Sequence, residues 1–271
     1  MSESKIIVMP EDVYRHDREK EKARRMFDNS EARKAFENVL DHETLMALMK
    51  LDEREVIEKM YGTVESGKES LVFLADTPEG ERVLVKIYMN RAGGFRDMEN
   101  YLRGDKRFRN IKSGRRSVIN EWCKKEYKNL KKASNILRCP EAIAFQKNIL
   151  VMEFIGREFS PFPKLKDVVI ENPETALKKT LNEIEKLWRE EKLVHGDLSE
   201  YNILVNDNGE LIWIDFSQGV HKTHPEAVNL LKRDVENVVD FFNDQGADQD
   251  PKKALEAIIS EEEAVEAGFN L

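Results

Sequence analysis

The chain is poor in cysteine and has no long apolar run. Only two of its 271 residues are cysteines, Cys123 and Cys139, and they form no Cys-x-x-Cys pair. We therefore expect neither a disulfide framework nor a zinc site. The low cysteine content is consistent with a protein of a reducing compartment. No apolar stretch approaches the roughly 20 residues of a membrane span. The charged first thirty residues do not resemble a secretory signal. These absences predict a cytoplasmic protein without a membrane partner.

An excess of basic residues is also absent. The 44 Lys and Arg residues face 52 Asp and Glu residues, which gives a net charge of -8. This balance favours solubility and argues against a protein that coats nucleic acid over its whole surface. Hydrophobic residues make up 40% of the chain, enough for a substantial core. The length predicts one large domain or two small lobes.

Residue patterning divides the chain into three parts. Residues 1–59 predict a charged N-terminal helical extension, with one short amphipathic helix or a helix pair over 36–51. Residues 60–155 predict a β-rich lobe, in which the polar, glycine-bearing stretch 91–116 predicts a flexible loop. Residues 156–271 predict a helical lobe. The expected fold class is therefore α+β with two lobes.

The elements follow from short-range signals. Runs of apolar residues bounded by turn formers predict strands at Leu71–Ala75, Arg82–Tyr88, Asn148–Phe154, Ile203–Val205 and Leu211–Ile214. The last two are joined by Asn206-Asp207-Asn208-Gly209, a strong hairpin signal. Apolar residues at steps of three and four predict helices from Leu177 to Trp188 and from Val228 to Phe242, and a charged helix is expected over 117–134.

The most informative segment is His-Gly-Asp-Leu-Ser-Glu-Tyr-Asn at 195–202, followed by the hairpin and by Ile-Asp-Phe at 214–216. The hairpin folds the chain back, so Asp197, Asn202 and Asp215 can converge at one end. Mg²⁺ takes a few hard oxygen ligands from protein and the rest from phosphate and water. Asn202 and Asp215 supply such oxygens, which leaves Asp197 to orient an attacking hydroxyl or accept its proton. A lone loop Asp is usually a cap or turn former, but here several constraints coincide.

These residues resemble the catalytic and metal-binding loops of the protein-kinase-like superfamily, and more narrowly the RIO family of atypical kinases. The matching segments are Glu65–Ser70 (ESGKES), Val85–Tyr88 (VKIY), Lys125–Leu130 (KEYKNL), Met152–Gly156 (MEFIG), the 195–202 loop and Ile214–Gln218 (IDFSQ). The Leu-Ser-Glu-Tyr-Asn form of the loop resembles the type-one subfamily.

The resemblance implies a two-lobed kinase fold that uses ATP with Mg²⁺ or Mn²⁺. It also implies serine/threonine protein kinase activity with autophosphorylation, an ATPase role in maturation of the small ribosomal subunit, and an aspartyl-phosphate on Asp215. The catalytic residues would be Asp197, Asp215, Lys86 and Asn202, with Asn202 and Asp215 on the metal.

Lys86 lies in the apolar strand Val-Leu-Val-Lys-Ile-Tyr, where an unpaired ammonium would be costly to bury. A kinase lysine pairs with nucleotide phosphates and with a helix carboxylate, for which Glu126 is the best candidate. An edge-strand lysine facing water is the alternative.

The stretch 62–70 nearly spells a P-loop, but Glu69 stands where Ser or Thr is required. Because a strand is predicted next, we reject the P-loop and expect a turn over the ATP phosphates, with Ser66, Gly67, Lys68 and Ser70 in contact with them. Met152–Ile155 would be the hinge, where the backbone carbonyl of Glu153 and the amide of Ile155 bind adenine. An ordinary core strand would look the same.

A basic segment lies within the predicted loop and contains Arg103, Lys106, Arg107, Arg109, Lys112, Arg115 and Arg116 against Asp105 alone. A solvated loop is the simplest interpretation, and contact with ribosomal RNA or another acidic partner is the alternative. Ser113 and Ser117 are candidate autophosphorylation sites.

The chain lacks an Ala-Pro-Glu motif and has no room for a long activation segment after Asp215. Besides a protein kinase and an ATPase, the sequence therefore leaves open a small-molecule phosphotransferase of the aminoglycoside or choline kinase kind. A binding-only pseudokinase is disfavoured because all four catalytic residues are present.

Overall fold

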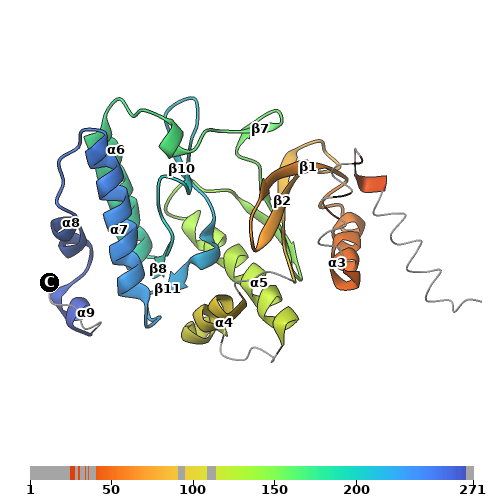
Figure 1. Cartoon of the computed structure of the whole chain (residues 1–271), viewed down its shortest axis with the longest axis horizontal. Coiled ribbons are helices and arrows are strands. Elements are labelled where there is room, and N and C mark those ends of the chain that lie inside the picture. Colours follow the sequence, from red (N-terminus) through yellow and green to blue (C-terminus); the bar gives the residue numbers. More distant parts are fainter. Residues whose placement is uncertain are drawn as a thin grey trace, which may run out of the picture.

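The computed structural model describes residues 25–27, 30, 34, 36, 41–90, 95–108 and 114–266. A sheet-containing lobe and a helical lobe follow one another along the long axis of the molecule (Figure 1). The predicted α+β, two-lobed class is confirmed. Most of the predicted helical extension before residue 41 lies outside the described residues.

The first lobe is built on a five-stranded antiparallel sheet with the strand order β1-β2-β3-β5-β4. Its strands are β1 (Lys59–Ser66), β2 (Ser70–Asp76), β3 (Arg82–Tyr88), β4 (Ala142–Gln146) and β5 (Ile149–Glu153). The prediction for β3 is correct at both ends. The strand β2 that follows the phosphate-loop candidate is confirmed, which excludes a P-loop because a P-loop opens a helix.

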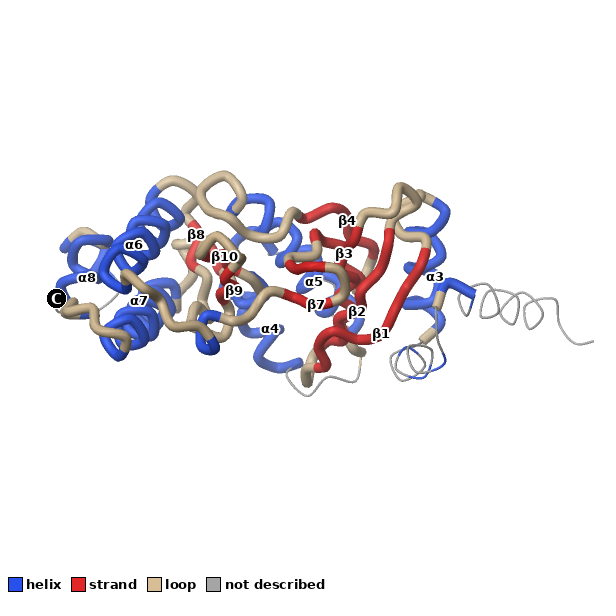
Figure 2. The backbone as a smooth tube through the Cα atoms, turned by 90° about the horizontal axis from the view of Figure 1, so that it is seen from above, coloured by secondary structure: helices blue, strands red, loops and turns tan. Residues whose placement is uncertain are grey.

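Helices α3 (His42–Glu53) and α5 (Arg115–Ala133) cover opposite faces of this sheet (Figures 1 and 2). Side chains alternate between the faces of a strand. On β3, Val85 and Ile87 therefore pack in the cluster with α3, whereas Tyr88 packs with α5. Lys86 shares the face of Tyr88, so the strand period directs its ammonium toward α5.

The second lobe consists mainly of α6 (Pro173–Arg189), α7 (Ala227–Asp244), α8 (Pro251–Ile258) and α9 (Glu261–Glu266). Pro173 begins α6 at a position where its missing N–H costs nothing. The lobe also contains the predicted hairpin, β9 (Ile203–Val205) with β10 (Leu211–Trp213), and the pair β8 (Leu193–Val194) with β11 (Val220–His221). The short hairpin β6 (Gly156–Arg157) with β7 (Ser160–Pro161) follows β5.

The prediction of a loop over 91–116 is wrong for most of its length. Residues Phe95–Gly104 form α4, Lys106–Phe108 form a 3₁₀ turn, η1, and α5 already begins at Arg115. Residues 91–94 and 109–113 lie outside the described residues. Met98 and Leu102 are buried, and Tyr101 packs edge-on against Trp122 of α5 with ring centroids 6.1 Å apart. Their three- and four-residue spacing is helical, but it was obscured by the many polar residues around them.

Within the part of the chain described, no helix is both long and apolar enough to cross a bilayer.

Candidate active site

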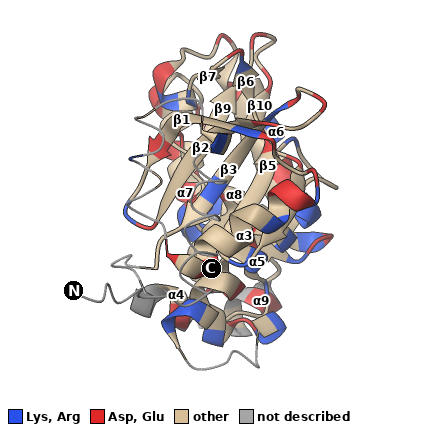
Figure 3. Ribbon diagram, turned by 90° about the vertical axis from the view of Figure 1, so that its right-hand side faces the viewer, with Lys and Arg blue, Asp and Glu red and all other residues tan. Residues whose placement is uncertain are grey.

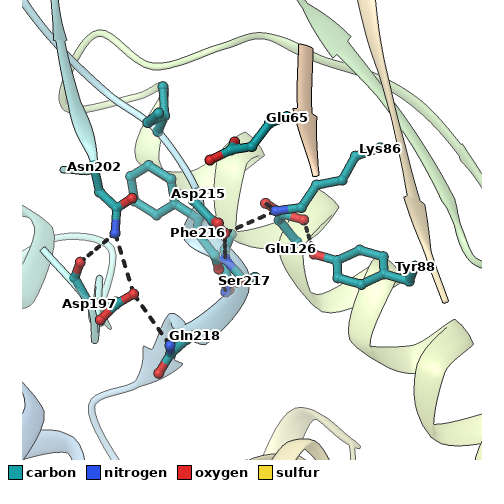
Figure 4. Close-up of polar contacts among 12 residues, drawn as sticks. Glu65, Lys86, Tyr88, Glu126, Asp197, Asn202, Asp215, Phe216, Ser217 and Gln218 are labelled. Carbon is teal, nitrogen blue, oxygen red and sulfur yellow. Dashed lines mark hydrogen bonds and ion pairs between the residues drawn. The ribbon is translucent and has the colours of Figure 1, made fainter. Parts of the chain in front are cut away.

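Three elements bring Lys86, Glu126 and Asp215 together. The Nζ atom of Lys86 on β3 lies 2.8 Å from Oε1 of Glu126 on α5 and 3.0 Å from Oδ1 of Asp215, which follows β10 (Figure 4). Lys86 and Glu126 are buried, whereas the Asp215 side chain is 43% exposed. The predicted pairing of Lys86 with Glu126 is therefore present, and Asp215 can still be reached from solvent.

The charges of this cluster stabilise one another. Burial disfavours the Lys86 ammonium, but the carboxylates of Asp215 and Glu126 outweigh it and raise the pKa of Lys86. Burial likewise opposes ionisation of Asp215, yet Lys86 and the Ser217 amide hold the pKa of Asp215 well below its usual value. The pKa of Glu126 is raised, mainly by burial. The Tyr88 hydroxyl donates a hydrogen bond to Oε2 of Glu126.

Asp215 begins a sharp turn at the end of the hairpin. Its backbone is left-handed, with φ of 59°, and Oδ1 accepts a hydrogen bond of 3.2 Å from Ser217 N. Left-handed geometry is disfavoured for most residues but is tolerated by Asp. The following residues, Phe216–Gln218, form the 3₁₀ turn η3. The carboxylate position is therefore coupled to the shape of this turn.

Asp197 and Asn202 lie on the loop between β8 and β9. Nδ2 of Asn202 donates to the Asp197 carbonyl at 2.8 Å and to Oδ2 at 3.3 Å, and Gln218 Nε2 donates to the same Oδ2 at 3.3 Å. Nη2 of Arg233 lies 3.9 Å from Oδ1. Burial raises the pKa of Asp197, and Arg233 opposes this. The side chain is 48% exposed, so a hydroxyl group can approach it.

Helix α7 and His195 hold the loop around Asp197. The carboxylate of Asp234 accepts hydrogen bonds from Gly196 N at 2.7 Å and Leu198 N at 2.8 Å. Burial raises the pKa of Asp234 to about 7. His195 Nε2 lies 3.0 Å from the Ile214 carbonyl, next to Asp215. The two neighbours of Asp197 in the chain, Gly196 and Leu198, are thus held by hydrogen bonds from their backbone amides.

The donor set at Asn202 and Asp215 fits a magnesium ion. Nδ2 of Asn202 donates its hydrogen bonds to Asp197, so the amide oxygen of Asn202 points away from Asp197 (Figure 4). Ile214 N donates to the Asn202 carbonyl at 2.9 Å, so the chain segments that carry the two side chains are paired. Among the described residues, no group of three or more His, Cys, Asp or Glu side chains is placed so that it could hold a metal ion by itself. One amide and one carboxylate suit Mg²⁺, which keeps several water or phosphate ligands.

A cavity of about 380 Å³ opens beside the cluster between the two lobes. Its walls include Lys86, Glu126 and Asp215 together with the apolar side chains Val72, Leu84, Met152, Ile155, Leu204 and Ile214. Apolar walls with a few convergent polar groups are typical of ligand sites. The salt bridge from Lys164 to Glu65, 3.4 Å long, joins two residues of its rim.

Not every predicted site residue lines this cavity. The wall from β1 is formed by Val64 and Glu65, while Ser66, Gly67, Lys68 and Ser70 lie beyond it at the β1–β2 turn. Gly67 N donates to the Ser70 carbonyl at 3.0 Å, which closes the turn. Lys68 is exposed. These four residues therefore lie next to the lining of the cavity in the chain but are not part of it.

Only part of the predicted hinge segment, Met152–Ile155, lines the cavity. Met152 and Ile155 line the cavity, whereas the Glu153 side chain points to Arg138 in a bidentate ion pair. In the described part of the chain, the Ile155 amide has no hydrogen-bond acceptor, while its carbonyl accepts from Phe162 N at 3.2 Å. A free amide at the wall of the cavity is available to a ligand.

Four further residues hold the site and were not predicted as site residues, namely Tyr88, Gln218, Arg233 and Asp234. A signal existed for Asp234, because a carboxylate on the apolar face of a predicted helix requires partners. The other three are ordinary side chains whose role depends on where their elements pack.

The basic segment is largely neutralised where it is described. Arg103 pairs with Glu99, Arg107 with Asp105, and Arg116 with Asp41. Lys and Arg positions nevertheless recur along the ribbon of α5 (Figure 3). Arg109, Lys112 and Ser113 lie outside the described residues.

The RIO domain profile matches residues 71–255, more than half of the chain. This chain belongs to the RIO family. "RIO-type serine/threonine-protein kinase Rio1" of Methanocaldococcus jannaschii is 42% identical over 229 residues, which cover 84% of this chain and 78% of the relative. The protein of the same name from Haloferax volcanii is 39% identical, covering 92% and 85%. The predicted resemblance to type-one RIO kinases is confirmed.

The RIO fold is also recovered by structural comparison. A crystal structure of Rio2 kinase from Chaetomium thermophilum, a complex with ADP, Mg²⁺ and phosphoaspartate, superposes with a TM-score of 0.59 at 20% identity. The superposition covers 84% of this chain and 71% of the other. At this identity the likeness concerns the fold alone.

Proposed function

We propose that this RIO chain is an ATP-dependent serine/threonine protein kinase that also phosphorylates itself. The observation that carries the proposal is the convergence of Lys86, Asp197, Asn202 and Asp215 beside one interlobe cavity. The names of the archaeal relatives support it. Protein substrates follow from this class of activity.

ATP would occupy the cavity, with adenine between Leu84, Met152, Ile155 and Leu204 and hydrogen-bonded to the Ile155 amide and the Glu153 carbonyl. Lys86 would then exchange its contact with Asp215 for the α- and β-phosphates while Glu126 keeps it in place. Lys68, Ser66 and Ser70, in the β1–β2 turn, would contact the outer phosphates.

Asn202 and Asp215 would hold Mg²⁺, or Mn²⁺, which neutralises phosphate charge when bound. Asp197 would accept a hydrogen bond from the attacking hydroxyl and take its proton. Burial and the neighbouring Asp215 raise the pKa of this carboxyl group, which strengthens it as a base, while Arg233 and Asn202 oppose the shift. A positioned base of this kind contributes about 10²–10⁴-fold to the rate.

Two features support a second activity. The Asp215 carboxylate is exposed, and the segment that follows Asp215 is too short to be a long activation segment. We propose that Asp215 accepts the γ-phosphoryl group: one carboxylate oxygen bonds to phosphorus as the bond to the ADP oxygen breaks, and water then hydrolyses the acyl phosphate. The phosphoaspartate in the Rio2 complex supports this chemistry. Such an ATPase cycle would act in the cytoplasm on a small ribosomal subunit precursor, with ribosomal RNA near α4 and α5. A small-molecule phosphotransferase is the alternative.

Asp197→Asn should lower phosphoryl transfer from ATP to protein by at least about 100-fold and leave nucleotide affinity within a few-fold, because Asp197 does not line the cavity. Asp215→Asn should abolish the Mg²⁺ dependence of binding. Asp207→Asn is the matched control, since Asp207 lies in the β9–β10 turn and pairs with Arg157 at the surface.

Radiolabelled ATP separates the activities. Acid-stable label on Ser113 or Ser117 indicates autokinase activity, whereas hydroxylamine-labile label indicates Asp215. Wild-type turnover in Asp197→Asn would refute its role as the base. Phosphorylation of a free sugar or choline without protein label would favour the alternative.

A further inference from the structure

The turn that follows Asp215 is tied to α5 by two buried side chains. Nδ2 of Asn129 donates to the carbonyl of Phe216 at 3.0 Å and to that of Gly219 at 2.8 Å. Nζ of Lys125 donates to the carbonyl between them, that of Ser217, at 2.5 Å. Lys125 and Asn129 are both 0% exposed. Three carbonyl groups of a four-residue segment thus accept hydrogen bonds from one helix face.

These bonds bear on Asp215 because its carboxylate is part of the same turn. Oδ1 of Asp215 accepts from Ser217 N, whose own carbonyl is held by Lys125. The left-handed backbone of Asp215 is a disfavoured conformation that persists only where its surroundings fix it. If the carbonyls lost their donors, the turn could relax and the carboxylate would move away from Asn202.

A third residue sets the orientation of Asn129. Nη1 of Arg107, on η1, donates to Asn129 Oδ1 at 2.9 Å, so the amide nitrogen must face the turn. Arg107 is itself fixed by Asp105, which is 0% exposed and accepts from Nε at 3.0 Å and Nη2 at 2.6 Å. A bidentate pair of this kind sets the direction of the guanidinium as well as its position.

The environment of Lys125 leaves it little freedom. Its ammonium lies 4.0 Å from the centroid of the Trp122 ring, which provides a cation–π contact in place of water. Gly219 also fits closely, because a Cβ atom there would meet Asn129 Nδ2 at 2.8 Å. The network is therefore a packed support for the turn and not a set of exchangeable surface bonds.

We propose that Lys125, Asn129 and Arg107 are positioning residues that hold Asp215 in the geometry needed to bind the metal ion. The proposal rests on the proposed function, since it assigns a supporting layer to the same site. None of the three lines the described nucleotide cavity, so they act on the metal through the turn.

The test uses the full chain and ADP, with its affinity measured by calorimetry in EDTA and across a Mg²⁺ titration. We expect each of three variants to raise the Mg²⁺ concentration for half-maximal enhancement of ADP binding by about tenfold: Asn129→Leu, Lys125→Met and Arg107→Gln. A change of about tenfold is what the loss of one buried hydrogen bond typically costs. Affinity for ADP in EDTA should change by less than threefold.

Lys124→Met is the matched control, because Lys124 neighbours Lys125 but pairs with Glu121 at the surface. Its Mg²⁺ midpoint should equal that of the wild type. The double variant Arg107→Gln with Asp105→Asn removes the guanidinium without leaving the buried Asp105 carboxylate unpaired, so it decides the question if the other variants fail to fold.

Midpoints within twofold of the wild type in the folded variants would overturn the proposal. So would a parallel loss of ADP affinity with and without Mg²⁺, which indicates general damage to the fold. If wild-type protein shows no Mg²⁺-dependent ADP binding, the proposed function itself fails, and the two failures are thereby distinguished.

Discussion

Replacing Lys86 by methionine removes the ammonium that pairs with both Glu126 and Asp215 while keeping the length of the side chain. The two acids are affected differently. Asp215 is 43% exposed and can be hydrated, but the Glu126 side chain is 1% exposed and becomes an unpaired buried charge. Removing one partner of a buried ion pair typically costs about 3–5 kcal/mol.

Protonation of Glu126 sets an upper limit to this cost. Its ordinary pKa is 4.5, and holding the carboxyl group neutral in the folded state costs about 1.4 kcal/mol for each pH unit above that value. The loss of stability should therefore be at most about 4 kcal/mol at pH 7.5 and about 1.4 kcal/mol at pH 5.5. The pKa of Glu126 in the folded variant lies above its value in the unfolded chain. The free energy of unfolding therefore falls as the pH increases.

Urea unfolding followed by tryptophan fluorescence measures this loss at both pH values. The double variant Lys86→Met with Glu126→Gln removes the orphaned charge and should recover about 2 kcal/mol at pH 7.5, because the amide oxygen that replaces the carboxylate can still accept a hydrogen bond from Tyr88. Affinity for ATP should be reduced in both variants, since neither has the ammonium.

Two results would refute the reasoning. If Lys86→Met is destabilised equally at pH 5.5 and 7.5, Glu126 is not the group that carries the cost. If the double variant is no more stable than the single one, the pair does not hold a buried charge. Arg82→Met, which breaks a pair with Asp76 nearer the surface, is the control and should cost about 1 kcal/mol or less.

Two further outcomes are expected. Burial lowers the pKa of His195 to about 4 from its ordinary 6.5, so the wild type should lose about 3 kcal/mol of stability between pH 7 and pH 4 that His195→Gln does not lose, because only the unfolded histidine takes up a proton in that range. Equal pH profiles in urea unfolding would contradict this. Leu102→Ala in α4 should cost about 2–5 kcal/mol, whereas Arg103→Ala, 74% exposed, should cost under about 0.5 kcal/mol; equal melting temperatures would show that α4 is not part of the folded core.

Local patterns account for what could be predicted. The bounds of β3 and β9 follow from short apolar runs between turn formers, and the hairpin follows from Asn206–Gly209. Because that hairpin is short, the loop with Asp197 and Asn202 must return close to Asp215. The convergence of these three residues was therefore accessible without a structure.

Helix α4 shows where such patterns fail. Its few apolar residues are separated by charged ones, and it becomes a helix in this chain because Met98 and Leu102 are buried and Tyr101 packs against Trp122 of α5. Propensity and periodicity are weak when the deciding energy comes from packing between elements. The same limit applies to the 66–70 turn, whose predicted contact with the ATP phosphates stays a prediction, since these residues do not line the cavity.

The chemical groups of the site, its family, and the contacts within one hairpin and one loop can be read from the amino-acid order, because they depend on residues close together in the chain. Which carboxylates meet Lys86, across 40 and 129 residues, and which side chains of α5 hold the turn after Asp215 depend on how the helices pack on the sheet. The reason is that a buried charge or amide takes whichever partner the packing of helix on sheet brings within about 3 Å, and that distance is not encoded in the spacing of residues along the chain.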